Sequence, residues 1–192
     1  MKQPQYLTML VIAATLIAAG CKKDNDDPVS PAPPANEEEL ITTVRLTFQS
    51  AGNTETKHFS YVDLDGDGGG APVIEADTLS ADTGYTVTIQ VLNESEVPAE
   101  DITAEIQAEE EAHQFFFQPS GANVTVAYAD ADGNGRPVGL ASIWTVGAAS
   151  NGTITVTLRH EPDKGAAGVS AGDITNAGGE TDIEVTFPLV ID

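Results

Sequence analysis

The residues of this chain with the clearest chemical potential are acidic side chains in two loops that repeat one pattern. In both loops, oxygen-bearing side chains alternate with other residues, and glycine permits the sharp turn that gathers them around one point. The candidate ligands are Asp63, Asp65 and Asp67 in the first loop and Asp130, Asp132 and Asn134 in the second. Calcium takes about six to eight such oxygens, so the pattern predicts calcium as a candidate cofactor.

Neither loop completes the EF-hand pattern, which ends in a glutamate that binds calcium through both carboxylate oxygens. This chain has Ile74 and Ala141 at the corresponding positions. Glu75 and Asp77 could approach the first loop from the strand expected after it. The alternative for both loops is an Asp-Gly turn on a solvated edge. If calcium binds, its dissociation constant is expected in the extracellular range of about 10⁻⁴–10⁻³ M.

Three histidines offer a second kind of metal chemistry. His58, His113 and His160 are the only ones in the chain. Glu109 and Glu110 lie four and three residues before His113, so on a helix they would share its face. Zinc accepts imidazole and carboxylate ligands. Nothing in the sequence brings the three histidines together, however, and the sequence favours separate polar histidines.

Motifs of catalysis are weak in the sequence. It contains no H-E-x-x-H zinc site. Residues 168–172 match G-x-S-x-G, but this pattern indicates a nucleophile turn only between a strand and a helix, and no helix is expected there. With 30 acidic residues, some carboxylate pair is expected by chance and does not by itself indicate a glycoside hydrolase. We therefore do not expect an enzyme.

Charge restricts the partners of the chain. Its 192 residues include 30 acidic and 8 basic side chains, which give a formal net charge of −22 at pH 7. Nucleic acids are bound largely through Lys and Arg at their phosphates, so a nucleic-acid partner is not expected. The small number of basic side chains also argues against a basic patch that binds anionic lipid. The charge favours solubility, metal cations or basic protein partners.

The elements that would position these residues are mostly strands, because apolar and polar residues alternate with a period of two. Alternation is clear in six segments, at residues 44–48, 55–62, 85–91, 124–128, 154–158 and 183–187. Residues 115–117 and 143–146 are weaker candidates. The pattern predicts an all-β fold for residues 40–192, a sandwich of seven to eight antiparallel strands.

Residues 99–112 are the exception to this pattern. Their Ala, Glu and Gln content favours a helix, which Asp101 could cap with Glu105 in its first turn. Ile102 and Ile106 also fit a period of two, so a strand or an irregular acidic insert is the alternative. We expect a short helix.

The N-terminal segment predicts export. Residues 1–20 combine a basic residue, an apolar run and small residues directly before Cys21, which are the parts of a secretory signal peptide. The run is shorter than the roughly 20 apolar residues of a spanning helix. Cys21 is the only cysteine, so it cannot form an intramolecular disulfide. Residues 21–39 are rich in proline and acidic residues, as is typical of an extended tether.

The stretch Ala18-Ala19-Gly20-Cys21 resembles the lipobox of bacterial lipoproteins, with Ala18 where leucine is commonest. The resemblance implies lipidation of Cys21 by diacylglycerol, cleavage after Gly20 and acylation of the new amine. Two or more acyl chains hold a protein firmly on a membrane. Residues 22–27, Lys-Lys-Asp-Asn-Asp-Asp, resemble the signal that sends lipoproteins of the Bacteroidetes to the outer face of the outer membrane. The periplasmic face is the alternative location.

Residues 79–93 resemble the corner and strand of fibronectin type III and related immunoglobulin-like modules. Leu79, Thr83 and Tyr85 precede a strand with alternating Val and Ile, as in those modules. The resemblance implies an immunoglobulin-like sandwich in which the hydroxyl of Tyr85 returns to the backbone. The acidic insert that follows residue 93 departs from the family.

Residues 41–191 as a whole resemble uncharacterised lipoproteins of the Bacteroidetes lineage. The likeness lies in residues 63–68, 110–116, 158–162 and 181–187, and it implies a fold and a location but no activity. We expect a surface-exposed, lipid-anchored protein that binds or scaffolds an unknown protein or glycan, with the lipid anchor as its only membrane contact. The alternatives are a periplasm-facing solute-binding lipoprotein and a small glycan-acting enzyme.

Overall fold

The computed structural model describes residues 40–66 and 68–192. The predicted signal peptide at residues 1–20, the tether at residues 21–39 with its Cys21, and the candidate ligand Asp67 lie outside the described residues. All described residues belong to one unit, Glu38–Asp192.

Strands dominate the described part of the chain. They are β1 (Thr43–Ser50), β2 (Thr56–Val62), β3 (Val73–Ala76), β4 (Gly84–Leu92), β5 (His113–Ser120), β6 (Val124–Tyr128), β7 (Ala141–Val146), β8 (Ser150–His160) and β9 (Glu180–Ile191). One helix, α1 (Ile102–Ala108), lies between β4 and β5, and two 3-10 turns, η1 (Val169–Ala171) and η2 (Ile174–Asn176), lie between β8 and β9. The predicted all-β fold is confirmed. The strand beyond the predicted number is β3, which is short and mostly exposed.

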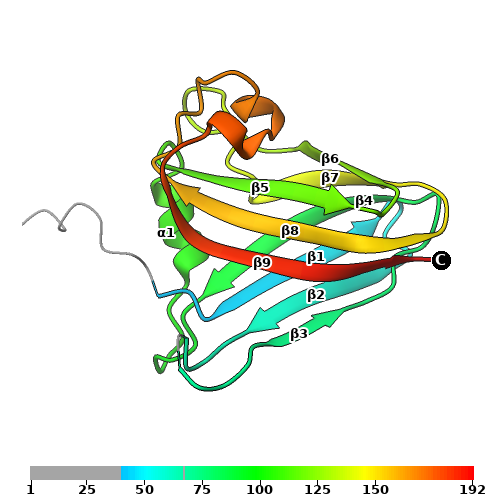
Figure 1. The fold of residues 1–192 in the computed structure, drawn as a ribbon, viewed down its shortest axis with the longest axis horizontal. Coiled ribbons are helices and arrows are strands. Elements are labelled where there is room, and N and C mark those ends of the chain that lie inside the picture. The colour runs from blue at the N-terminus through cyan, green and yellow to red at the C-terminus, as the bar shows by residue number, and fades with distance from the viewer. Residues whose placement is uncertain (1–39, 67) are drawn as a thin grey trace, which may run out of the picture. The chain divides into compact units, whose positions relative to one another are not determined.

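The strands form two antiparallel sheets. One has six strands in the order β3-β2-β1-β4-β7-β6, and the other has three in the order β5-β8-β9. Figure 1 shows the smaller sheet lying across the larger one, which confirms the predicted sandwich. The division into six and three is less even than in immunoglobulin domains, because β3 and β6 extend the edges of the larger sheet.

The core lies between the two sheets and follows the period of two. In β1, the side chains of Val44, Leu46 and Phe48 are buried while the intervening ones are partly exposed, as alternation across a strand requires. The ring centroid of Phe48 lies 4.6 Å from that of Phe59 and 5.0 Å from that of Trp144. These aromatic contacts join β1, β2 and β7 and stabilise the centre of the larger sheet.

Helix α1 confirms the helical expectation for residues 99–112 and corrects one detail. Ile102 and Ile106, one turn apart, are both buried, so a helical period places them on one inward face. Asp101 occupies the N-cap position, but its side chain makes no capping hydrogen bond. The first turn is held instead by Thr103, whose hydroxyl accepts from the Val91 N–H at 2.8 Å and donates to the Val91 carbonyl at 3.1 Å.

Tyr85 forms the predicted corner at the start of β4. Its hydroxyl accepts a hydrogen bond from the backbone N–H of Ser80 at 3.0 Å and donates to the carboxylate of Glu55. Bonds from the hydroxyls of Tyr85 and Ser80 lower the pKa of Glu55. Burial, followed by the bond to Glu55, raises the pKa of Tyr85. Tyr85 therefore has a structural role, as the sequence implies.

Residues 79–81 connect the larger sheet to the last strand of the smaller one. The Leu79 N–H donates to the Val190 carbonyl at 2.9 Å, and the Asp192 N–H donates back to the Leu79 carbonyl at 3.1 Å. The Ala81 N–H donates to the Asp192 carbonyl at 2.7 Å. These bonds hold β9 in place along the edge of the sandwich.

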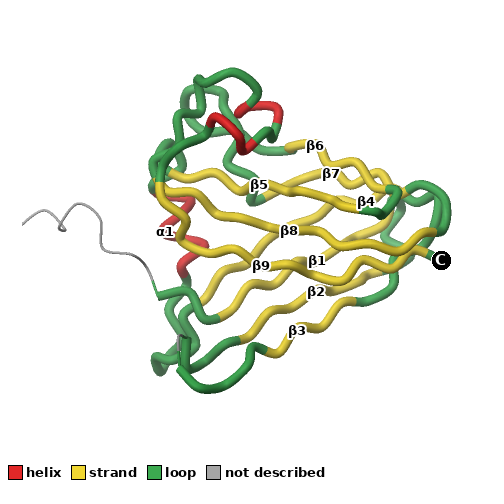
Figure 2. The backbone as a smooth tube through the Cα atoms, in the orientation of Figure 1, coloured by secondary structure: helices red, strands yellow, loops and turns green. Residues whose placement is uncertain are grey.

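The segment that contains η1 and η2 covers the outer face of β5. Phe116, Val169 and Ala177 form a small buried cluster there, and the side-chain amide of Gln114 donates to the Val169 carbonyl at 2.9 Å. Figure 2 shows the two turns and α1 as separate helical elements on the strand framework. This cover brings Lys164, which precedes η1, close to the end of α1.

Candidate functional site

The first acidic loop follows β2 directly. The Asp63 N–H donates to the Thr42 carbonyl at 2.8 Å, and one oxygen of the Asp63 carboxylate accepts from the Tyr61 hydroxyl at 3.1 Å. The other oxygen, Oδ1, is buried and has no hydrogen-bond partner among the described residues. The carboxylate of Asp65 accepts a hydrogen bond from the Gly70 N–H at 3.0 Å, and its carbonyl accepts one from the Gly68 N–H at 2.9 Å. Gly66 has φ +55°, which is the sharp turn that the pattern predicts.

In the described part of the first loop, one buried carboxylate oxygen, Oδ1 of Asp63, is left without a hydrogen-bond donor. A buried carboxylate oxygen without a donor is costly to leave unsatisfied, and Asp63 has such an oxygen. The position of Asp67 lies outside the described residues, so the convergence of all three carboxylates stays a prediction.

In the second acidic loop, backbone N–H groups of the chain itself donate hydrogen bonds to the aspartate carboxylates. Both oxygens of Asp130 accept backbone N–H bonds, from Gly139 and Ala141, at 2.9 Å each. Oδ1 of Asp132 accepts from the N–H groups of Asn134 and Arg136, also at 2.9 Å each. Asp132 is buried, whereas Asn134 is exposed. These contacts favour the turn interpretation of the second loop, and calcium binding there stays a prediction.

The cation that Asp132 does bind is the amine of Lys164. Nζ lies 2.9 Å from Oδ2 of Asp132, and the side chains of the two residues are only 3% and 1% exposed. Nζ also donates to the Glu110 carbonyl at 2.5 Å. Burial disfavours the charged form of Asp132, but the bonds from the Arg136 N–H, Lys164 and the Asn134 N–H outweigh it and lower the pKa of the carboxyl. Lys164 thereby joins the second loop to the end of α1.

Two of the three histidines lie together, which corrects the expectation of separate histidines. His113 begins β5, His160 ends β8, and the antiparallel register places them opposite each other. Their rings are stacked, with centroids 4.8 Å apart and planes inclined by 8°. His58 lies elsewhere, exposed on β2, with Nδ1 at 3.4 Å from the Thr47 hydroxyl.

Glu109, at the end of α1, completes a group of potential metal ligands with this histidine pair. Ligand atoms of Glu109, His113 and His160 all lie within 4.8 Å of one another, and no other such group of three is found among residues 40–66 and 68–192. Nδ1 of His113 lies 3.2 Å from the Glu109 carbonyl oxygen. Nε2 of His113 lies 4.0 Å from Oδ2 of Asp182, a carboxylate that is 7% exposed.

The protonation of His113 follows from its surroundings. Burial lowers its pKa most. The bond to the Glu109 carbonyl and the charge of the Glu109 carboxylate raise it, whereas the charges of His160 and Lys164 lower it. The net direction is below the ordinary value of 6.5, so the ring is neutral at pH 7. A neutral imidazole is the form that binds metal ions.

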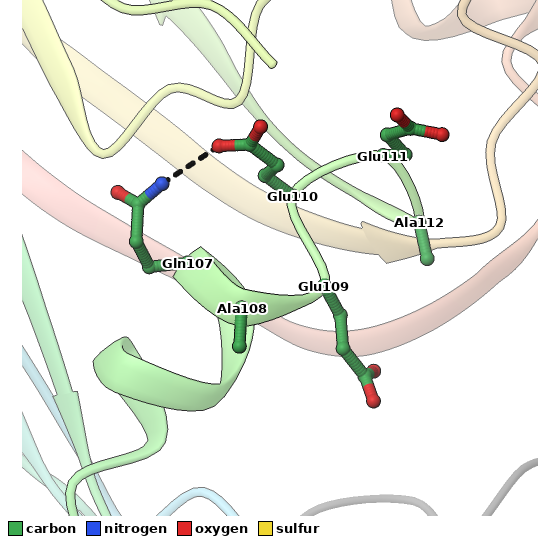
Figure 3. Close-up of a pocket in the computed structure, with 6 residues that line it drawn as sticks. All are labelled: Gln107, Ala108, Glu109, Glu110, Glu111 and Ala112. Carbon is green, nitrogen blue, oxygen red and sulfur yellow. Dashed lines mark hydrogen bonds between the residues drawn. The ribbon is translucent and has the colours of Figure 1, made fainter. Parts of the chain in front are cut away.

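A pocket of about 490 Å³ lies beside this group, at the C-terminal end of α1, and is lined by residues 107–112. The Gln107 amide donates to the Glu110 carboxylate at 2.8 Å, and Figure 3 shows this bond on the side toward which Glu110 and Glu111 point. The carboxylate of Glu109 points to the opposite side of the segment (Figure 3). The pocket is therefore lined by acidic and small side chains rather than by the apolar and aromatic ones typical of small-molecule sites.

Comparison with protein-family models, with curated proteins and with solved structures finds no match for this chain. Among the residues that the structure describes, no helix is long and apolar enough to cross a membrane. The sequence reasoning missed Lys164 and Asp182. For Lys164, the only signal was a basic residue in a strongly acidic chain. For Asp182, nothing in the local sequence indicates that it lies next to His113.

Proposed function

We propose that this chain is a lipid-anchored binding or scaffolding protein exposed on the outer face of an outer membrane. The observation that carries the proposal is the only cysteine of the chain, Cys21, placed directly after an apolar run and small residues. A thiol in that position is the acceptor for lipid in bacterial lipoproteins. The lysines and acidic residues at positions 22–27 support surface exposure.

The all-β unit supports a role in binding rather than catalysis. Its core is closed by strands and α1, and its chemical groups lie at the ends of strands, in the two acidic loops and at the end of α1. Rigid scaffolds commonly present binding residues in this way. A net charge of −22 favours basic protein surfaces or cation-bridged glycans as ligands.

Calcium is the cofactor that we propose for the first acidic loop. The buried Oδ1 of Asp63 has no hydrogen-bond donor among the residues that the structure describes, and calcium would supply such a partner. Asp65 is exposed, so its carboxylate has room to turn toward the same ion. The site would be weak, in the range of about 10⁻⁴–10⁻³ M, and would stiffen the connection between β2 and β3.

Metabolic labelling with a palmitate analogue tests the anchor. The parent protein should incorporate the label, and Cys21→Ser should abolish incorporation because serine offers no thiolate. A Cys21→Ser protein that still incorporates label contradicts the anchor assignment. Protease treatment of intact cells then tests the location, since a surface protein is degraded and a protein on the periplasmic face is protected. Protection would favour the periplasmic alternative.

A further inference from the structure

We propose that Glu109, His113 and His160 form a binding site for a transition-metal ion of the zinc class. The inference goes beyond the proposed function and does not depend on the lipid anchor. It also concerns a different chemistry from the calcium proposal, since imidazole nitrogen suits zinc, cobalt, nickel or copper, whereas calcium prefers oxygen ligands alone.

The backbone fixes two of the three ligands. His113 and His160 are directly opposed on neighbouring strands β5 and β8, so the distance between their rings is set by the sheet. Glu109 belongs to the segment that leads from α1 into β5, four residues before His113. Hydrogen bonds from the His113 ring and from the Ala112 N–H, both to the Glu109 carbonyl, hold that segment against the strand end.

The ligand atoms need to move only a short distance toward one another to bind one zinc ion. They lie within 4.8 Å of one another, and zinc, at about 2.0–2.2 Å from each ligand, needs tetrahedral ligand atoms roughly 3.4 Å apart. Glu109 is exposed and His160 is half-buried, so both side chains have room to turn. His113 is buried and serves as the fixed ligand.

The hydrogen bond of His113 selects the nitrogen that binds. With Nδ1–H donating to the Glu109 carbonyl, the neutral ring carries its lone pair on Nε2. In metal-binding histidines, one ring nitrogen usually binds the metal while the other donates its N–H to a carbonyl or carboxylate.

The charges around the group also favour a cation. Oδ2 of Asp182 lies 4.0 Å from Nε2 of His113, which places a buried carboxylate beside the proposed ion. Lys164 is the nearby positive charge, and it is already paired with Asp132. Three protein ligands leave a fourth position of zinc for water or for a group of a bound partner.

The test uses the full-length protein in detergent with Cys21→Ser, which removes the only thiol of the chain as a competing ligand. The protein is stripped with EDTA, freed of chelator and titrated with Co²⁺ at pH 7.5, and Zn²⁺ binding is measured by calorimetry. We expect one equivalent of each metal, with the visible absorption of cobalt in a four- or five-coordinate site. Acidification should release the metal, because protons compete with metal ions for imidazole nitrogen.

His160→Gln and Glu109→Gln are the deciding variants, since neither residue is part of the buried core. Each should lower the metal affinity by roughly tenfold or more, because loss of even an outer partner of a metal ligand has an effect of that size. His58→Gln is the matched control, because it removes a histidine on β2 and should leave binding unchanged. Asp63→Asn should also leave cobalt binding unchanged, which separates this site from the first acidic loop.

Several results would overturn the proposal. They are the absence of stoichiometric cobalt and zinc binding near neutral pH, unchanged binding in His160→Gln, and an equal loss in His58→Gln. Far-UV circular dichroism establishes that each variant is folded. If His160→Gln alone is unfolded, Glu109→Gln decides, and unchanged binding in that variant contradicts the site.

Discussion

The amine of Lys164 lies 2.9 Å from Oδ2 of Asp132, and both side chains are almost completely buried. Their charges are therefore screened very little by water. The attraction between them offsets the cost of burying each one only while both are present. Because Nζ also bonds the Glu110 carbonyl, the pair connects three segments that are far apart in the sequence.

Replacing Lys164 should destabilise the fold strongly. Lys164→Met leaves Asp132 buried without its cation, and the loss in the free energy of unfolding should be about 3–5 kcal/mol, measured by urea denaturation. Lys57→Met is the control, since Lys57 and Glu55 form a partly exposed pair at 3.6 Å that should contribute less than about 1 kcal/mol. Asp132→Asn added to Lys164→Met should recover part of the loss. A loss below about 1 kcal/mol for Lys164→Met would contradict this interpretation.

The burial of His113 should make stability depend on pH. Its pKa is below 6.5 in the folded protein, so the unfolded chain binds more protons in that range. Its contribution to stability is complete above the unfolded pKa, about 6.5, and is lost as the pH falls toward the folded pKa. The groups that face the ring are the Glu109 carbonyl, His160, Lys164 and Asp182.

The measurement is the urea midpoint at pH 7.5 and at pH 5, in EDTA so that no metal contributes. The parent should lose stability between the two values, and His113→Gln should lose less. His58→Gln should behave as the parent, because that side chain is exposed. An identical pH dependence in His113→Gln and the parent would show that other groups, such as the many carboxylates, account for it.

Calcium should stabilise the folded unit through the first acidic loop. A ligand that binds only the folded state adds RT ln(1 + [L]/Kd), about 1.4 kcal/mol at ten times Kd. This is a few degrees in melting temperature for a domain of this size. Asp63→Asn and Asp65→Ala should each remove most of the gain, whereas Asp132→Ala should remove little of it.

The measurement is a thermal melt in EDTA and in millimolar calcium at constant ionic strength, which holds general screening of the acidic surface fixed. Magnesium should raise the melting temperature less, because it dehydrates reluctantly and requires stricter octahedral geometry. Asp82→Asn is the charge-matched control. Asp82 is exposed with φ +52°, a conformation that Asn also adopts. Equal shifts in Asp63→Asn and the parent would reduce the first loop to a turn.

Local pattern predicted most of the strands because alternation is a property of neighbouring residues. Val44, Leu46 and Phe48 are buried in β1, as their spacing indicates, and Tyr85 forms the corner at the start of β4, as the resemblance to immunoglobulin-like modules implies. Residues 99–112 fitted two periods, and burial of Ile102 and Ile106 on one face decided in favour of the helix. These outcomes depend on contacts within or next to an element.

The candidate metal group could not be predicted in this way. His113 and His160 meet because of the register between β5 and β8, and a shift by one residue would have turned one ring to the other face of the sheet. The pairing of Lys164 with Asp132 likewise depends on how the segment before η1 folds over β5. Both relationships belong to tertiary structure, which the alternation of a single strand does not encode.

The position of β9 has a consequence for how this protein acquires its fold. Phe187 of β9 lies against Phe59 of β2, with ring centroids 5.6 Å apart, and the backbone at residues 79–81 pairs with the end of β9. A chain that crosses a membrane from its N-terminus presents β2 long before β9 follows. The part of the larger sheet around Phe59 therefore lacks this cover until Glu180–Ile191 arrives, and contacts of such long sequence separation form slowly. During that interval, a newly made chain depends on whatever prevents exposed strands from aggregating.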